Sequence, residues 1–234
     1  MTEKYNKYER PIVLLHGLGP RKIVHGAMWP LKMYLKHIGG YKNIFHVSYD
    51  VNEIPFEEAL SKLDAQLEGI LNKDTDEPII VGQSMGGVMA NNLHKMGWTI
   101  HKTISIGSPL HGAKFLNIME DTLPTSVATK MKRKSYEYLM TKEREEPPPH
   151  EYHTISAAWP RPVTKFVHAV LGIFTKIPQW ENFRDFDGCV FIDETKYCDK
   201  NHTHIAWADH RTVVAGPRLW TVVLNKINHE NEPI

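Results

Sequence analysis

The stretch PIIVGQSMGG, residues 78–87, places a serine at the end of a segment that favours a buried strand. The residues after Ser84 have the pattern of a helix, and Gly82 and Gly86 stand two positions before and after it. By chance, a G-x-S-x-G pattern should occur only about 0.03 times in a chain of this composition. On a sharp strand-to-helix turn, the strained backbone exposes the serine hydroxyl and leaves no room for side chains two residues away. The stretch therefore predicts a nucleophilic serine at the carboxyl edge of a sheet.

Short apolar runs alternate with longer helical segments along the rest of the chain, which is the pattern of βα units. Several runs are apolar on consecutive residues, as expected for strands that helices cover on both faces. We expect helices over 27–38, 55–72 and 85–96, and another that begins at Pro217. The expected strands are 11–17, 43–49, 78–82, 102–108, 152–158 and 202–208. The sequence thus predicts an α/β fold with a mostly parallel six-stranded sheet flanked by helices.

The chain has 234 residues, of which 41% are hydrophobic, and this is enough for one large core. We therefore expect a single domain over 1–234. Two connections between expected strands are too long for simple crossovers, and long connections in a compact domain are usually functional covers or disordered segments. We expect them to contain cap or lid insertions at 113–150 and 160–184.

The second insertion contains an amphiphilic stretch near the expected mouth of the site. Phe166, Val170 and Phe174 lie in this stretch and are candidate substrate-binding residues. As an apolar lid, they would suit a lipid-like acyl ester and a transient contact with a lipid surface. Packing as an ordinary core helix explains the same pattern equally well.

A serine hydroxyl is a weak nucleophile unless a base accepts its proton, and a third group must hold that base in one tautomer. The chain has 14 histidines, so topology must choose among them. His202 and His204 stand at the start of the last expected strand, up to roughly 20 Å from its carboxyl edge at 3.3 Å per residue. His210 follows that strand, in a loop before the final helix, and is the candidate base. An ordinary loop histidine is the alternative.

The candidate acid is Asp187, in the stretch DFDG before an apolar segment. An Asp-Gly turn that enters such a segment can hold a carboxylate at the tip of a loop. Asp185 and then Asp193 are the alternatives, and all three could instead be ordinary turn or capping residues.

A tetrahedral oxyanion needs two fixed backbone donors. The amide of Met85 is one candidate, because it stands next to Ser84 at a helix N-terminus that favours negative charge. The glycine-containing stretch LLHGLGP after the first strand could supply the other, and Leu18 is the candidate there. A glycine-rich turn without a catalytic role is the alternative for this loop.

Five short stretches, LLHGLG, VGQSMGG, IGSPLHG, FDGCV and ADH, occur in this order and span nearly the whole chain. Together they resemble the α/β-hydrolase superfamily, especially small lipases and esterases. The resemblance implies the α/β-hydrolase fold, and the family order of nucleophile, acid and base is matched by Ser84, Asp187 and His210. It also maps the oxyanion donors to Leu18 and Met85.

The implied function is that of a serine hydrolase that cleaves a small-molecule acyl ester through an acyl-enzyme intermediate, without a cofactor. An acyltransferase or thioesterase with the same triad is the main alternative, and a non-catalytic binding module is another. The chain departs from many lipases at Gln83, where histidine is common. His111, in the IGSPLHG stretch, is interpreted as a loop-shaping residue.

Composition argues against several other classes of protein. Lys and Arg total 28 against 27 for Asp and Glu, so no global field would recruit nucleic acid. The N-terminus does not resemble a signal peptide, so we expect a cytoplasmic location. No apolar stretch is long enough to span a bilayer, so no transmembrane helix is expected. In the cytoplasm, the thiols of Cys189 and Cys198 should remain reduced. A metal site built from Cys198, His202, His204 and Asp209 fits no common zinc spacing, and none is predicted.

Overall fold

The computed structural model describes most of the chain. The described residues are 6, 8–18, 21–50, 53–113, 116, 134–142, 146–158, 187, 189–190, 192–206, 208–210 and 212–229. The expected insertion at 160–184, with Phe166, Val170 and Phe174, lies outside them.

Six strands form one sheet in which every pairing is parallel, so the predicted sheet is confirmed. Their order across the sheet is β2-β1-β3-β4-β5-β6. The strands are β1 (Ile12–Leu15), β2 (Ile44–Val47), β3 (Ile79–Gln83), β4 (Lys102–Ile106), β5 (Glu151–Ala158) and β6 (His202–Ala206).

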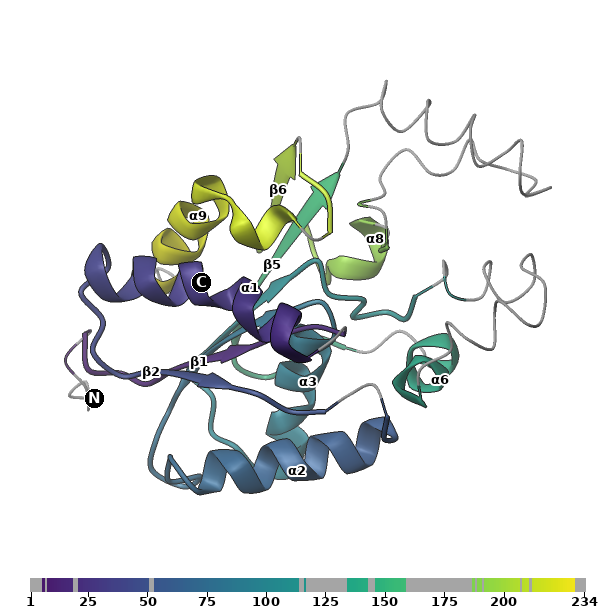
Figure 1. The fold of residues 1–234 in the computed structure, drawn as a ribbon, viewed down its shortest axis with the longest axis horizontal. Coiled ribbons are helices and arrows are strands. Elements are labelled where there is room, and N and C mark those ends of the chain that lie inside the picture. The colour runs from purple at the N-terminus through teal and green to yellow at the C-terminus, as the bar shows by residue number, and fades with distance from the viewer. Residues whose placement is uncertain are drawn as a thin grey trace.

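Helices cover both faces of the sheet (Figure 1). One face carries α1 (Arg21–His37) and α9 (Pro217–Asn228), and the other carries α2 (Phe56–Glu68) and α3 (Met85–Leu93). Alternate residues of β1 enter separate hydrophobic clusters, with Ile12 and Leu14 on the α1 and α9 side and Val13 and Leu15 on the other. Because both faces of the central strands are buried, β1 and the first three residues of β3 are apolar on consecutive positions.

The strand order changes direction at β1. The chain passes from β1 outward to β2 and then returns to β3 on the other side of β1. Connections that leave neighbouring strands in opposite directions open a crevice at the carboxyl ends of those strands, and ligands of open α/β sheets bind there. The turn after β3, which contains Ser84, lies at this switch point.

The described part of the 113–150 insertion includes α6 (Lys134–Thr141), which packs on α2. The rings of Tyr138 and Phe56 stack with centroids 3.7 Å apart. Leu139 is buried, and its carbonyl accepts a hydrogen bond from the amide of Ala113. This helix is therefore joined to the main core. Among the described helices, none is long and apolar enough to cross a membrane.

Three short helical elements complete the described structure: η1 (His94–Met96), α8 (Ile192–Thr195) and η3 (Thr212–Ala215). The predicted helix over 85–96 is thus observed as α3 followed by η1, which ends at Gly97 with a positive φ of 93°.

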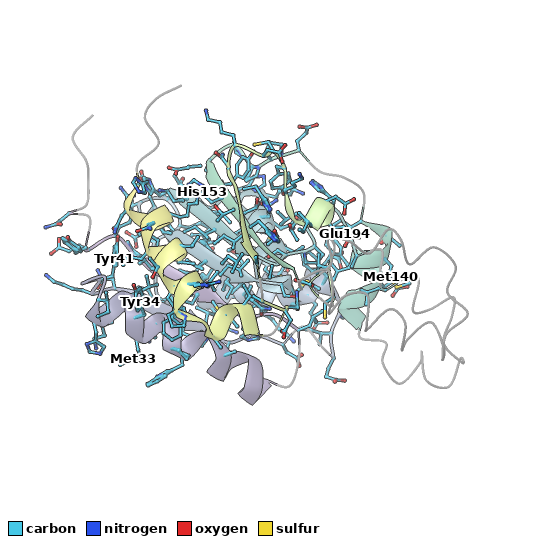
Figure 2. The ribbon with its side chains drawn as sticks, turned by 90° about the horizontal axis from the view of Figure 1, so that it is seen from above. Met33, Tyr34, Tyr41, Met140, His153 and Glu194 are labelled. Carbon is cyan, nitrogen blue, oxygen red and sulfur yellow. The ribbon has the colours of Figure 1, made fainter. Side chains whose placement is uncertain are left out.

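Polar contacts hold α9 against α1 and the residues that follow it. The hydroxyl of Tyr41 donates to the Asn228 side chain at 2.7 Å, and the hydroxyls of Tyr34 and Thr221 lie 3.2 Å apart. Both tyrosines lie beside α9 in Figure 2. At the amino edge of the sheet, the fully buried Lys102 ammonium donates to backbone carbonyls at the end of α9.

Candidate active site

Ser84 occupies the turn between β3 and α3. Its φ of 53° and ψ of −123° lie in a strained region, and among the described residues it alone has a positive φ without being glycine. The amide of Ser84 donates to the carbonyl of Ile106 at 2.8 Å, and its carbonyl accepts from the amide of Gly87 at 3.0 Å. The hydroxyl therefore stands at the carboxyl edge of the sheet and at the N-terminus of α3.

The two glycines that flank Ser84 are required by close backbone contacts. A Cβ atom at Gly82 would overlap the backbone of Gly86 and Gly87. A Cβ atom at Gly86 would overlap the carbonyl of Leu15 in β1. The spacing of the pattern thus follows from packing the turn between its own strand and the neighbouring one.

The structure brings Ser84, His210 and Asp187 together. Nε2 of His210 lies 2.9 Å from Oγ of Ser84, and Nδ1 lies 2.7 Å from Oδ2 of Asp187. Asp187 is 1% exposed and His210 9% exposed, so little water competes for these contacts. With the carboxylate accepting from Nδ1–H, the lone pair of Nε2 is available to accept the serine proton.

The loop of Asp187 holds this carboxylate in place. Its other oxygen, Oδ1, accepts hydrogen bonds from the amides of Cys189 at 2.9 Å and Val190 at 2.8 Å. The carbonyl of Asp187 also accepts from the amide of His210 at 2.9 Å. The acid and the histidine are therefore joined through both the backbone and the side chains, although they follow different strands.

Gly107, at the end of β4, gives the Asp187–His210 pair its space. Its φ is 53°, which favours glycine. A Cβ atom there would lie 3.2 Å from Oδ2 of Asp187 and 3.3 Å from Nδ1 of His210. A larger residue would press directly on the hydrogen bond between them.

No family model matches this chain, and no curated protein matches it by sequence. Solved structures do match. The mature lipase BlEst2 of Bacillus licheniformis is 17% identical with a TM-score of 0.68, covering 96% of this chain and 94% of that one. The metagenomic carboxyl esterase MGS0156 is 11% identical with a TM-score of 0.58, covering 95% and 76%. Phospholipase PlaB of Legionella pneumophila is 10% identical with a TM-score of 0.56, covering 80% and 45%.

The chain has the α/β-hydrolase fold. This confirms the fold that the sequence motifs imply. The turn that contains Ser84 and the loops that contain Asp187 and His210 follow β3, β5 and β6, so all three lie at one edge of the sheet.

The two candidate oxyanion donors belong to segments that meet at Ser84. Met85 is the first residue of α3, where the first backbone N–H groups have no acceptor within the helix. A Cβ atom at Gly17 would lie 2.7 Å from Cβ of Ser84, so the loop after β1 lies directly against the nucleophile turn. Leu18 is the next residue in that loop. The roles of both amides remain predictions.

Gln83 makes a contact that the sequence motifs did not indicate. Its buried side chain donates from Nε2 to the carbonyl of His210 at 3.3 Å. The last residue of β3, next to Ser84, thus supports the loop that contains His210. No pattern in the sequence relates positions 83 and 210, because the contact exists only after β3 and β6 join one sheet.

Among the other candidate acids, Asp185 lies outside the described residues, and Asp193 lies in the first turn of α8. His111 contacts α8 and the residue after it. Its Nε2 lies 3.0 Å from the carbonyl oxygen of Lys196, and its backbone amide donates a hydrogen bond to the carbonyl of Glu194. These contacts agree with a loop-shaping role for His111.

His202 and His204 lie together on β6, and a ring nitrogen of each contacts Oγ of Ser156, at 2.9 Å and 3.1 Å. Across the part of the chain that the structure describes, no group of three or more His, Cys, Asp or Glu side chains is arranged to hold a metal ion. Neither Cys189 nor Cys198 forms a disulfide bond within the described part of the chain.

Proposed function

We propose that this protein is a serine hydrolase that cleaves carboxylic esters, with Ser84 as nucleophile, His210 as general base and Asp187 as the acid that orients His210. The observation that carries this proposal is the continuous chain of contacts from Oγ of Ser84 through the His210 ring to Asp187, at 2.9 Å and 2.7 Å. Both distances fall within the range of working hydrogen bonds between such groups.

In the first half-reaction, the Ser84 hydroxyl attacks the acyl carbon and its proton moves to Nε2 of His210. The C–O bond to the alcohol breaks, and the protonated His210 returns the proton to the leaving alkoxide. An acyl-enzyme ester on Ser84 remains. The buried carboxylate of Asp187 stabilises the imidazolium that forms in this step.

In the second half-reaction, water replaces the alcohol. His210 accepts a proton from water as the oxygen attacks the acyl carbon, and then returns it to Oγ of Ser84 as the acyl-enzyme bond breaks. The products are a carboxylic acid and the free enzyme. During both attacks, the amides of Met85 and Leu18 would donate to the oxyanion.

The substrate class is inferred from the fold neighbours, which are named as a lipase, a carboxyl esterase and a phospholipase. We propose an acyl ester, with lipids included, and an acyl group that contacts Phe166, Val170 and Phe174 in a lid insertion. Transient contact with a lipid surface would follow from such a lid. An acyltransferase or thioesterase would use the same triad with a different acceptor or leaving group.

The test combines covalent labelling with turnover. A fluorophosphonate probe should add one label at Ser84 of the wild type, located by peptide mass spectrometry. The Ser84→Ala variant should take no label. Its kcat should fall by about 10⁶-fold, because removal of a triad serine has an effect of that order. Ser61→Ala is the matched control, since Ser61 lies on the exposed face of α2.

The substrates should be p-nitrophenyl esters from acetate to palmitate, with added alcohol or thiol acceptors in parallel reactions. Hydrolysis that depends on Ser84 and His210 supports the proposal, and its chain-length optimum separates an esterase from a lipase. Dominant transfer to an added acceptor would identify a transferase instead. Activity that persists in Ser84→Ala, or a wild type that takes no label, would refute the mechanism.

A further inference from the structure

Tyr49 contacts the loop that contains the candidate donor Leu18. This loop follows β1, whereas Tyr49 stands two residues after β2, the neighbouring strand. Both Tyr49 and His16, the first loop residue, are buried, at 2% and 1% exposed. Nothing in the sequence motifs assigns a role to Tyr49.

Tyr49 holds His16 by three contacts. Its ring stacks on the imidazole, with centroids 4.5 Å apart and planes 8° from parallel. Its hydroxyl donates to the carbonyl of His16 at 2.5 Å. Its backbone amide donates to Nε2 of His16 at 3.4 Å. Burial raises the pKa of the Tyr49 hydroxyl, so the group remains a neutral donor at physiological pH.

These contacts select one tautomer of His16. Because Nε2 accepts from the amide of Tyr49, the ring proton of the neutral imidazole lies on Nδ1. Nδ1 in turn lies 2.8 Å from the carbonyl oxygen of Gly17 and donates to it. Tyr49 therefore acts on the carbonyl of Gly17 through the ring of His16.

The carbonyl of Gly17 and the amide of Leu18 belong to one peptide group. A trans peptide is planar, and its C=O and N–H point in opposite directions, so fixing the first fixes the second. Among the described residues no peptide bond is cis. Tyr49 follows β2 on one side of β1, whereas Ser84 follows β3 on the other side. A carbonyl held from the β2 side leaves the Leu18 N–H free to point toward the β3 side.

We propose that Tyr49, acting through His16, is a positioning residue that aims the amide of Leu18 at the oxyanion formed on Ser84. This inference rests on the ester hydrolysis proposed above and extends it to residues outside the triad. It predicts that loss of the Tyr49 contacts affects the transition state more than the bound substrate, because the oxyanion exists only after attack.

The first variant is Tyr49→Phe, which keeps the ring stack and removes the hydroxyl. Removal of a whole oxyanion donor reduces kcat about 10²- to 10³-fold, so we expect misalignment of one donor to reduce it by about 10-fold. KM should stay within twofold. The affinity for a trifluoromethyl ketone, which forms a tetrahedral oxyanion adduct with the serine, should fall in proportion to kcat.

Tyr41→Phe is the matched control. Tyr41 is also buried, and its hydroxyl also donates one hydrogen bond, to Asn228 at 2.7 Å, but this contact fastens α9 and touches no residue of the site. Both variants should lose similar amounts of thermal stability. Only Tyr49→Phe should lose kcat and affinity for the ketone.

A second pair of variants tests His16 as the intermediate. The side-chain amide of His16→Asn places a donor near the position of Nδ1, whereas His16→Leu places none there. We therefore expect His16→Asn to recover at least threefold of the kcat that His16→Leu loses.

The outcomes separate this inference from the proposed function. A wild type that neither hydrolyses the ester panel nor takes a label at Ser84 overturns the proposed function, and the positioning role falls with it. An active wild type whose Tyr49→Phe variant matches Tyr41→Phe in kcat and in ketone affinity overturns the positioning role alone. Equal kcat in His16→Asn and His16→Leu overturns it as well.

Discussion

Nε2 of His210 lies 2.9 Å from Oγ of Ser84, although the two residues are 126 positions apart in the chain. Parallel strands bring them together, because the loops that follow β3 and β6 leave the same edge of the sheet. Asp187 reaches the same place from the loop that follows β5. The candidate site is therefore assembled from three separate loops, and substitutions can test each of them independently.

Asp187→Asn should leave the fold intact and reduce kcat by about 10⁴-fold, since an amide does not hold the histidine in the tautomer that accepts the serine proton. Asp193→Asn, at one of the alternative acids, should change kcat by less than twofold. Steady-state kinetics on a p-nitrophenyl ester, with circular dichroism to check folding, makes the comparison. A large loss in Asp193→Asn with none in Asp187→Asn would assign the acid differently.

Gly107→Ala should reduce kcat by at least 10-fold. The new methyl group would lie 3.2 Å from Oδ2 of Asp187 and 3.3 Å from Nδ1 of His210, and would therefore shift their hydrogen bond. Backbone strain at its positive φ should also cost about 1–2 kcal/mol of folding stability. Kinetics and urea denaturation of the same preparation measure both effects.

The control for that substitution is Gly97→Ala. Gly97 also has a positive φ, but the nearest atom to an added Cβ is Cε of Lys73, at 3.7 Å. This variant should lose a similar amount of stability and keep the wild-type kcat. If both variants lost kcat equally, backbone strain alone would explain the loss. A contact of the new methyl group with the Asp187–His210 pair would then not be needed to explain it.

Lys102→Met should lower the free energy of unfolding by roughly 1–3 kcal/mol, because it removes the charged donor from its carbonyl acceptors and from the Glu151 carboxylate, although Glu151 keeps its contact with His153. The ammonium of Lys102 lies 3.0 Å from the Glu151 carboxylate and donates to the carbonyls of Lys226 and His229. The double variant Lys102→Met/Glu151→Gln should recover part of this loss in urea denaturation. Equal stabilities for the single and double variants would argue against the pair.

The pH dependence of stability should carry a contribution from His202. Burial, with added repulsion from Lys196, lowers the pKa of His202 from 6.5 to about 4. Between these two values the unfolded chain binds a proton that the folded chain does not. The free energy of unfolding should therefore fall as the pH falls from about 6.5 to 4, and His202 should contribute no slope above pH 7.

His202→Gln should flatten this slope, because it removes the titrating group and retains a side chain able to contact Thr154 or Ser156. Urea denaturation at several values between pH 8 and pH 4.5 provides the measurement. The burial of His150 also lowers its pKa to about 4, so His150→Gln should flatten the slope further. A slope that is unchanged in both variants would contradict the assignment.

The sequence indicated the six strands and the turn that contains Ser84. Short apolar runs indicated all six strands, and in several of them the apolar residues are consecutive, because strands buried on both faces have no polar positions to alternate with. The glycines around Ser84 identified the turn, because only glycine fits where backbone segments nearly touch. Local constraints of this kind can be predicted directly from the amino-acid sequence.

Only the tertiary structure decided how distant residues support one another. It placed Asp187 and His210 in contact, brought the Gln83 amide to the carbonyl of His210, and stacked Tyr49 on His16. These contacts depend on strand order and on loops that meet at one edge of the sheet. The order of the motifs suggested Asp187 and His210 as partners, but no spacing or composition in the chain indicated the contacts of Gln83 and Tyr49.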